Sequence, residues 1–244
     1  MTTVQVEIHP DRAALVARSQ QLVQARIQAA IAARGTCALA LAGGSTPKPL
    51  YAALAQTDLP WSKLQIFWGD ERYVPADHPD SNAGMAKAAW LDQVPIPPSH
   101  IHPMPTQFAD PAAAAAAYEQ TLHQVLGANP VLDIVLLGMG DDGHTASLFP
   151  QTAALGVRDR LVTVGTKGDE PRLTLTAPLI NQSRCVIFLV SGESKQPALS
   201  AVFAPTGDDA AFPSRLIRPQ GELWWLLDAA AGAPLQTWPN VQVF

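Results

Sequence analysis

The chain has 244 residues, and at roughly 150 residues per domain this length fits one large domain or two small ones and excludes a short peptide. Apolar residues make up 48% of the chain and charged residues 15%, which excludes the composition of a disordered protein. The net charge is −5, from 16 basic and 21 acidic residues, and no basic block is present, so we expect no nucleic-acid partner.

Short apolar runs predict buried strands, and the segments between them predict helices. The runs cover residues 37–41, 64–68, 132–137, 185–190 and 223–227, and the helical patterns cover residues 11–34, 48–55 and 110–126. Near-continuous apolar strands that alternate with helices are typical of a parallel sheet covered on both faces. We therefore predict one α/β domain over residues 1–244, with a Rossmann-like, mostly parallel doubly wound sheet and helices on both faces.

The ligand crevice of such a sheet lies beyond the carboxyl ends of its strands. This rule places function in the loops that follow Leu41, Trp68, Leu137 and Val190. The chain must meet any anionic ligand there with a local pocket, because its overall charge is negative.

Nothing in the sequence predicts secretion or a membrane location. The first ten residues lack a basic segment followed by an apolar one, and no run reaches the ~18 apolar residues that a membrane span needs. Cys37 and Cys185 lie inside predicted buried strands, where free cysteine behaves as a small apolar residue. We therefore expect a cytoplasmic protein with no disulfide and no membrane partner, while its oligomeric state stays open.

The first candidate loop contains the turn Gly43-Gly44-Ser45, followed by Thr46-Pro47 and a predicted helix. Glycines allow backbone N–H groups to approach an anion closely, and a helix N-terminus favours negative charge. The turn therefore either binds phosphate or is an ordinary capped turn, and the pattern supports both interpretations equally.

The second loop begins with three consecutive charged residues, Asp70, Glu71 and Arg72. Two acids and a base beside a crevice suggest that they orient a polar substrate, and Arg72 suits a planar anion or a developing oxyanion. The alternative is a solvated loop end, where charged runs are common. Further along, Ser81-Asn82 begins a helical pattern, so this pair either caps the helix or adds a polar contact to the pocket.

The third loop has the spacing G-x-G-x-x-G within residues 138–143, which is found in dinucleotide-binding turns. We exclude a dinucleotide because Asp141 and Asp142 place negative charge where a pyrophosphate would sit, and because the motif lies in mid-chain. The loop also carries His144 beside these carboxylates. A carboxylate that orients one imidazole nitrogen leaves the other as a base near neutral pH.

Two basic residues in the second half of the chain complete the candidate pocket. Arg172 precedes an alternating segment, and Lys195 follows the apolar strand that ends at Val190. Each alone would be interpreted as a surface charge, but their positions at strand ends in an acidic protein favour a role in anion binding.

The remaining histidines and the serines give weaker signals. His100 and His102 are two residues apart, but no cysteine or third ligand lies at a metal-binding spacing, so we predict no metal site; adventitious binding by this pair stays open. His9, His78 and His123 are expected at the surface. No G-x-S-x-G motif is present, which favours activated water over a serine nucleophile.

At these positions the chain resembles the 6-phosphogluconolactonase family. Three segments carry the resemblance in the same order: AGGSTP at residues 42–47, GDERYVP at residues 69–75 with the Ser81-Asn82 pair, and GMGDDGHTASLFP at residues 138–150. The ending HTASLFP distinguishes the lactonases from the related glucosamine-6-phosphate deaminases. Asp-Glu-Arg likewise stands where those deaminases typically have Asp-Glu-Tyr.

The resemblance implies a Rossmann-like α/β fold and hydrolysis of 6-phospho-D-glucono-1,5-lactone in the oxidative pentose phosphate pathway, with no cofactor. It also implies that His144 is the general base that activates water, with Asp70 and Arg72 near the reacting centre. The substrate-binding residues that we predict are Gly43, Gly44, Ser45, Asn82, Asp142, Arg172 and Lys195. Only Glu170-Pro171 leads into Arg172, where the family commonly has a longer Pro-Pro segment.

Two other functions use the same features. Deamination or isomerisation of an amino-sugar phosphate would use the same crevice, and release of ammonia from glucosamine 6-phosphate distinguishes it. A non-catalytic sugar-phosphate sensor would need a DNA-binding segment, and the sequence contains no spare helix-turn-helix pattern or basic patch.

Overall fold

The computed structural model describes residues 4–239 and 241–244. Residues 1–3 and residue 240 lie outside the described part, so the prediction that the first ten residues form no targeting signal falls partly outside it. The strands are β1 (Val4–His9), β2 (Cys37–Leu41), β3 (Leu64–Trp68), β4 (Asp70–Arg72), β5 (Ile134–Leu137), β6 (Val162–Lys167), β7 (Glu170–Leu175), β8 (Cys185–Val190), β9 (Glu222–Asp228) and β10 (Val241–Val243). The α-helices are α1 (Arg12–Arg34), α2 (Lys48–Leu54), α3 (Asn82–Ala89), α4 (Pro111–Leu126), α5 (Ala177–Gln182), α6 (Gln196–Phe203) and α7 (Ala229–Gly232).

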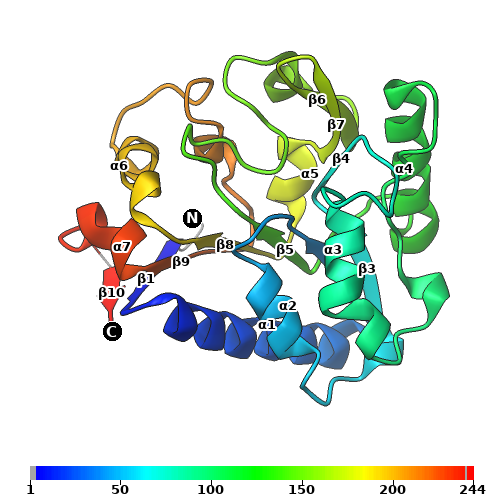
Figure 1. Ribbon diagram of the computed structural model, residues 1–244, viewed down its shortest axis with the longest axis horizontal. Helices are drawn as coiled ribbons and strands as arrows, with labels where there is room; N and C mark the ends of the chain where they lie inside the picture. Colours follow the sequence, from blue (N-terminus) through cyan, green and yellow to red (C-terminus); the bar gives the residue numbers. More distant parts are fainter. Residues whose placement is uncertain (1–3, 240) are drawn as a thin grey trace.

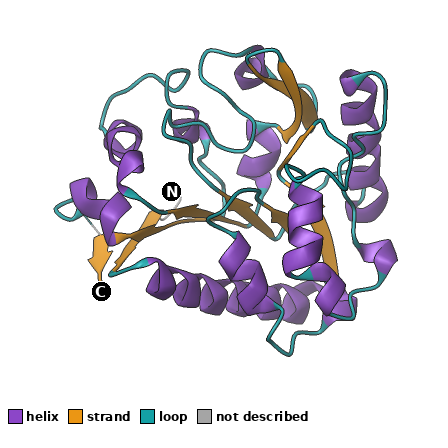
Figure 2. Ribbon diagram, in the orientation of Figure 1, coloured by secondary structure: helices purple, strands orange, loops and turns teal. Residues whose placement is uncertain are grey.

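The main sheet is parallel and lies between helices. Its strand order is β10-β1-β9-β8-β5-β2-β3, and every neighbouring pair runs parallel. Figures 1 and 2 show α1 and α2 on one face of this sheet and α5 and α6 on the other. The predicted fold class, a mostly parallel doubly wound α/β sheet with helices on both faces, is confirmed.

A second, antiparallel sheet was not predicted. It has the order β4-β7-β6. Its strands carry polar and charged residues between apolar ones, so they form no continuous apolar run of the kind that predicted the main sheet. The two-residue turn between β6 and β7 contains Gly168 at φ +59°, which is a sequence signal typical of a hairpin. This hairpin places β7 beside β4 at the edge of the main sheet.

Polar contacts attach α4 to the main sheet and cap the starts of two helices. The Tyr118 hydroxyl on α4 accepts from the Trp68 backbone N–H at 2.9 Å and donates to the His102 carbonyl oxygen at 3.1 Å. Asp11 and Asp110 cap the N-termini of α1 and α4 with their side chains. These contacts hold the strand ends and therefore the loops that follow them.

Cys37 and Cys185 are both buried and free. The prediction of a surface position for His9 is wrong. Its ring is buried, lies 3.2 Å from the Glu7 carboxylate and stacks on Phe244 at 5.0 Å, because β1 has a paired strand on each side. Among the described residues, no helix combines the length and the apolar character that a bilayer crossing requires.

Candidate active site

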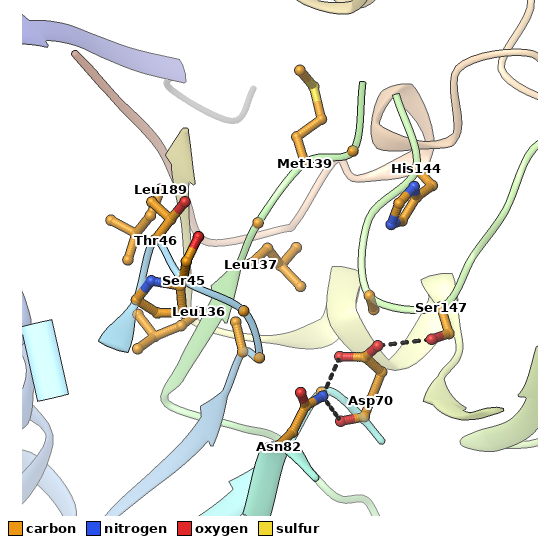
Figure 3. Close-up of a pocket in the computed structure, with 18 of the residues that line it drawn as sticks. Ser45, Thr46, Asp70, Asn82, Leu136, Leu137, Met139, His144, Ser147 and Leu189 are labelled. Atoms are coloured by element: carbon orange, nitrogen blue, oxygen red, sulfur yellow. Dashed lines mark hydrogen bonds between the residues drawn. The ribbon is translucent and has the colours of Figure 1, made fainter. Parts of the chain in front are cut away.

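A pocket of about 330 Å³ opens at the carboxyl edge of the main sheet (Figure 3). The loops after β2, β3, β5 and β8 all contribute to its lining, which is the edge that the strand pattern predicts. Lys167 and Arg172 on the β6–β7 hairpin form a further wall. Four loops that are far apart in the sequence therefore meet one polar hairpin around a single cavity.

The glycine turn after β2 lines this pocket with Gly43, Gly44 and Ser45. Gly44 has φ +94°, a left-handed conformation that strongly favours glycine. Pro47 is the N-cap of α2, and no side chain among the described residues caps this helix, so the interpretation as an ordinary capped turn is not supported. The Arg12 guanidinium donates to the Ser45 carbonyl oxygen and adds positive charge behind the turn.

The charged residues of β4 do not act together as the sequence pattern suggested. Asp70 and Arg72 line the pocket, whereas Glu71 points the other way and is buried, because side chains alternate along a strand. The Glu71 carboxylate accepts backbone N–H groups from Asn82 at 2.7 Å and Ala83 at 2.8 Å. Glu71 is therefore an anchor for the start of α3 and not a substrate ligand.

Asp70 lies at the floor of the pocket between two polar side chains (Figure 3). Ser147 Oγ donates to Asp70 Oδ2 at 2.7 Å, and Asn82 Nδ2 donates to the Asp70 carbonyl oxygen at 2.9 Å. Burial raises the pKa of the Asp70 carboxyl, and the Ser147 hydrogen bond and the charge of Arg72 oppose this effect only in part. The two carboxyl oxygens keep lone pairs that can accept hydroxyl groups of a ligand.

Asn82 is buried and lines the pocket beside the glycine turn. A Cβ atom on Gly43 would lie 1.8 Å from Asn82 Oδ1, so this close approach requires glycine. Among the described residues, Asn82 Oδ1 has no hydrogen-bond partner, and a buried acceptor without a partner costs free energy. A donor on a bound ligand would satisfy this atom. Ser81, and not Asn82, caps α3 by accepting from the Gly84 N–H.

His144 occupies the wall of the pocket formed by the loop after β5 (Figure 3). Its Nδ1 lies 2.6 Å from Asp142 Oδ1, and its ring packs against Phe149 at 4.5 Å between centroids. A carboxylate only accepts hydrogen bonds, so Nδ1 carries the proton and Nε2 is the nitrogen available as a base. The His144 side chain is 27% exposed, which leaves the ring accessible to water and ligand.

Asp142 acts on the pocket through His144. Burial pushes the pKa of the Asp142 carboxyl up, but the hydrogen bonds from the His144 backbone N–H and ring outweigh this effect and hold the pKa below its ordinary value. Asp142 is thus ionised and orients the imidazole, while its own side chain is not part of the pocket lining.

Arg72 and Arg172 face each other across β4 and β7, in direct register, and both line the pocket. Like charges that lie opposite each other in an antiparallel pair are destabilising. The Arg172 guanidinium is paired with Glu170 at 3.1 Å and its side chain is 13% exposed. Both arginines therefore bring positive charge to the same pocket.

Lys195 enters the pocket from the loop after β8. Its Nζ lies 2.6 Å from Asp141 Oδ1, and Ser194 Oγ donates to the same oxygen at 3.0 Å. The Lys195 hydrogen bond holds the pKa of the Asp141 carboxyl below its ordinary value. Asp141 therefore competes with any anion for Lys195.

The sequence interpretation assigned no role to several of these residues: Arg12, Ser147, Phe149 and Lys167. It named Asp141 and Asp142 together as carboxylates that could orient His144, and only Asp142 contacts the ring, whereas Asp141 pairs with Lys195. Ser147 belongs to the HTASLFP segment, so a signal for it was present. The contacts of Arg12 with Ser45 and of Lys195 with Asp141 join residues far apart in the sequence, and no local pattern predicts them.

The histidine pair after α3 lies outside the pocket. His102 Nε2 is hydrogen-bonded to Gln65 Oε1 at 2.7 Å, and its ring stacks on Phe67. Burial lowers the pKa of His102, and the neighbouring His100 lowers it further. Within residues 4–239 and 241–244, no three histidine, cysteine or acidic side chains are grouped so that they could hold a metal ion.

Residues 10–225 match the family model described as glucosamine-6-phosphate isomerases/6-phosphogluconolactonase. The chain belongs to this family. It is 59% identical over 234 residues to a 6-phosphogluconolactonase of Nostoc sp., which covers 94% of this chain and 98% of the relative.

Two further relatives support the placement within the family. A 6-phosphogluconolactonase of Synechocystis sp. is 57% identical over 236 residues, covering 95% of this chain and 98% of the relative. The solved structure of 6-phosphogluconolactonase from Trypanosoma cruzi superimposes with a TM-score of 0.87 at 32% identity, covering 97% of this chain and 98% of that one. The resemblance that the three sequence segments carry is therefore confirmed.

Proposed function

We propose that the protein hydrolyses 6-phospho-D-glucono-1,5-lactone to 6-phospho-D-gluconate, in the oxidative branch of the pentose phosphate pathway and in the cytoplasm, with water activated by His144. The family membership supports this reaction, since the relatives at 59% and 57% identity carry the name 6-phosphogluconolactonase. The arrangement of the pocket supports the mechanism and the residue roles set out below.

His144 serves as the general base. Its Nε2 takes a proton from a water molecule, and the water oxygen attacks C1 of the lactone to give a tetrahedral intermediate. When the C1–O5 bond breaks, the protonated imidazole returns the proton to O5, so the ring opens to the acid and no proton is lost or gained. The Asp142 carboxylate, 2.6 Å from Nδ1, stabilises the imidazolium that forms between these steps.

The floor of the pocket supplies the charge and the orientation that the reaction needs. Arg72 stabilises the negative charge that develops on the carbonyl oxygen. Asp70 accepts hydrogen bonds from sugar hydroxyl groups with its remaining lone pairs, and Asn82 Oδ1 accepts from another. A lactone is already electrophilic, so a base and an oxyanion ligand are sufficient for its hydrolysis.

The phosphate group binds to the glycine turn, Arg172 and Lys195. These groups come from three different loops, and each supplies an N–H or N⁺–H donor of the kind that holds a phosphate. Their binding energy positions C1 against His144, although they do not touch the reacting atoms.

One observation carries the proposal: an imidazole oriented by a carboxylate shares a single pocket with two arginines that face each other across β4 and β7. The arginines predict an anionic substrate, and the free imidazole nitrogen predicts proton transfer from water. Neither feature alone would distinguish a hydrolase from an anion-binding protein.

The direct test generates the lactone in situ from glucose 6-phosphate with a dehydrogenase and measures acid release above the spontaneous rate. We expect the wild-type protein to accelerate this release and His144→Ala to lower turnover by about 10²- to 10⁴-fold. His123→Ala, which removes an exposed histidine of α4, is the matched control and should retain turnover.

A second arm separates binding from catalysis. Lys195→Ala should raise the KM for the phosphorylated lactone with a smaller effect on turnover, while Lys63→Ala, at an exposed position, should change neither. Full turnover by His144→Ala would refute the assignment of the base. Ammonia release from glucosamine 6-phosphate without lactone hydrolysis would instead favour the deaminase activity.

A further inference from the structure

The loop that carries His144, residues 138–151, contains backbone that its own sequence does not favour. Ala146 has φ +47° and Gln151 has φ +58°, in the left-handed region that residues with a Cβ adopt only under constraint from their surroundings. The backbone hydrogen bonds within the loop join Gly140 to His144, Gly143 to Gly140 and Leu148 to Thr145, and none of these three involves Ala146 or Gln151. Contacts from outside the loop must therefore hold it in place.

Much of this support comes from the segment of residues 208–218, between α6 and β9. The Gln151 N–H donates to the Ala210 carbonyl oxygen at 3.0 Å, and the Ser214 N–H donates to the Gly143 carbonyl oxygen at 2.9 Å. Gly143 lies against Phe212 so closely that a Cβ on Gly143 would be 2.8 Å from Phe212 Cδ1. The segment thus contacts the loop on both sides of His144.

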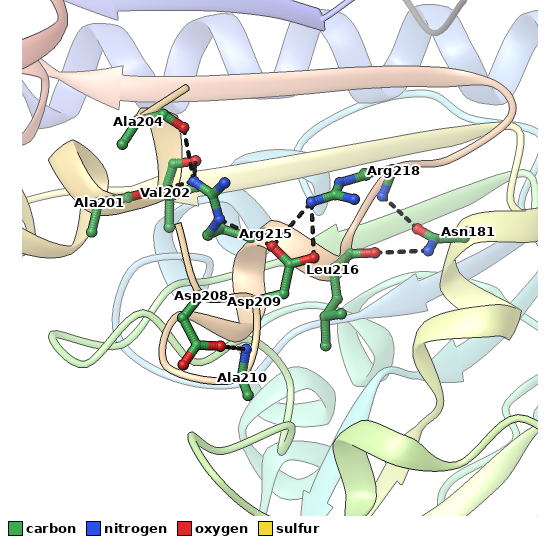
Figure 4. Close-up of polar contacts among 10 residues, drawn as sticks. All are labelled: Asn181, Ala201, Val202, Ala204, Asp208, Asp209, Ala210, Arg215, Leu216 and Arg218. Carbon is green, nitrogen blue, oxygen red and sulfur yellow. Dashed lines mark hydrogen bonds and ion pairs between the residues drawn. The ribbon is translucent and has the colours of Figure 1, made fainter. Parts of the chain in front are cut away.

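Arg215 connects this segment to α6 (Figure 4). Its Nη1 donates to the carbonyl oxygens of Ala201 at 2.8 Å, Val202 at 2.8 Å and Ala204 at 3.0 Å. These carbonyls belong to the C-terminal turn of α6, where the helix has no N–H groups to bond them and where positive charge is favourable. The Arg215 side chain is 9% exposed, so solvent cannot easily replace it.

Further contacts hold the guanidinium and the segment in register (Figure 4). Asp209 accepts from Arg215 Nε at 3.1 Å and from Arg218 Nη2 at 2.9 Å. Asn181 on α5 accepts from the Arg218 backbone N–H and donates to the Leu216 carbonyl oxygen. A Cβ on Gly207 would lie 2.8 Å from Arg215 Cζ, so the chain also closes over the guanidinium.

Helix α6 itself begins at the pocket, because Lys195 is its N-cap residue. The Lys195–Asp141 ion pair joins this end of α6 to the His144 loop. The Arg215 contacts join the other end to the same loop through the 208–218 segment. Both ends of α6 are thus tied to the loop that carries the base.

We propose that Arg215 is a positioning residue for His144: it fixes the 208–218 segment on the C-terminal turn of α6, and the segment in turn holds the strained His144 loop in its active conformation. Arg215 does not line the pocket and touches no substrate. The kinetic part of this inference rests on the proposed lactonase function, whereas its structural part does not.

The test compares Arg215→Met with Arg218→Met. Methionine keeps an apolar stem and removes every donor. Arg218→Met removes the same charge and another Asp209 contact, but its side chain is 64% exposed and reaches none of the three helix carbonyls. We measure kcat, KM and amide hydrogen exchange, with amides of β5 and β8 as internal markers of the folded sheet.

For Arg215→Met we expect kcat to fall by about tenfold or more with KM changed less than about threefold, as for a misplaced base. Exchange at Gln151 and Ser214 should accelerate by about tenfold or more while the β5 and β8 amides stay protected. Arg218→Met should match wild type within about twofold in each measurement. General unfolding would reduce the protection of loop and sheet amides alike, so faster exchange in the loop with protected β5 and β8 amides distinguishes a local effect from it.

A folded Arg215→Met protein with wild-type kcat and wild-type exchange in the loop would overturn the inference. If Arg215→Met does not fold, Arg215→Lys provides the test. Its ammonium group can donate to the three helix carbonyls but not to Asp209. We then expect kcat to fall about two- to fivefold and the amides of Gln151 and Ser214 to exchange faster. Unchanged kcat and exchange in Arg215→Lys would then show that Arg215 serves folding alone.

The two proposals can fail separately. If wild-type protein does not hydrolyse the lactone but Arg215→Met loosens the His144 loop selectively, the proposed function is wrong and the structural link stands. If wild-type protein hydrolyses the lactone and Arg215→Met retains its kcat and loop protection, only the positioning role is wrong.

Discussion

Replacement of Asp142 by Asn isolates the contribution of one contact to the proposed proton transfer. Asp142 Oδ1 lies 2.6 Å from His144 Nδ1 and also accepts the His144 backbone N–H at 3.1 Å. Asparagine has nearly the same shape but no charge, and its amide can turn either its oxygen or its nitrogen toward the ring. The variant therefore keeps the loop but weakens both the orientation of the ring and the stabilisation of the imidazolium.

The size of the effect follows from the exposure of the contact. A hydrogen bond to a charged group contributes about 1.5–3 kcal/mol, but the Asp142 side chain is 51% exposed and solvent screens its charge, so we assign about 1–2 kcal/mol. A transition state destabilised by this amount lowers turnover by about 5- to 30-fold. The loss is far smaller than the loss expected for His144→Ala, because the base itself remains.

The assay follows acid release from lactone generated in situ, with Asp159→Asn as a control that removes an exposed carboxylate outside the pocket lining. We expect the control to match wild type and Asp142→Asn to lose turnover with little change in KM. Wild-type turnover in Asp142→Asn would refute the orienting role of Asp142. A loss of turnover as large as that of His144→Ala would show that the Asp142–His144 contact contributes more than the roughly 1–2 kcal/mol assigned to it because of solvent screening.

Three further changes test the pocket. The pKa of Asp70 is raised in the folded protein, so the ionised carboxylate lowers the stability of the fold above that pKa. Asp70→Asn should therefore raise Tm at pH 7, and calorimetry should show a smaller rise toward pH 4. The same substitution should lower turnover. Asp141→Asn frees Lys195 and should tighten inorganic phosphate binding by about two- to fivefold in a titration. Arg172→Gln removes the like-charge contact with Arg72, so Tm without anion should rise by about 1–3 °C while the stabilisation by phosphate shrinks.

The main sheet could be predicted because its strands are buried on both faces and form continuous apolar runs. The predicted segments 37–41, 64–68 and 185–190 coincide with β2, β3 and β8. β1 was missed because it carries Glu7 and His9, whose burial depends on ion pairing and on coverage by β10. Such coverage is a tertiary property that no local pattern contains.

The candidate site could be predicted at the level of loops but not of side-chain directions. The rule for strand ends brought Asp70 and His144 to one pocket, yet it could not separate Asp70 from Glu71. That separation requires residues 70–72 to be a strand, and they are a strand only because β7 pairs with them. Likewise, Ser147 and Asp70 are 77 residues apart, so their hydrogen bond depends on the whole fold.

The second sheet explains how a parallel α/β sheet obtains a strongly cationic wall. The ends of the parallel strands supply the glycine turn and His144, and the β6–β7 hairpin adds Arg172 in register with Arg72. This arrangement is tolerated because Arg172 pairs with Glu170 and Arg72 donates to the Asp80 carbonyl oxygen. Under the proposed function, a phosphate that binds beside both arginines offsets the positive charge of two side chains at once. This favours a negatively charged ligand over a neutral sugar of the same shape.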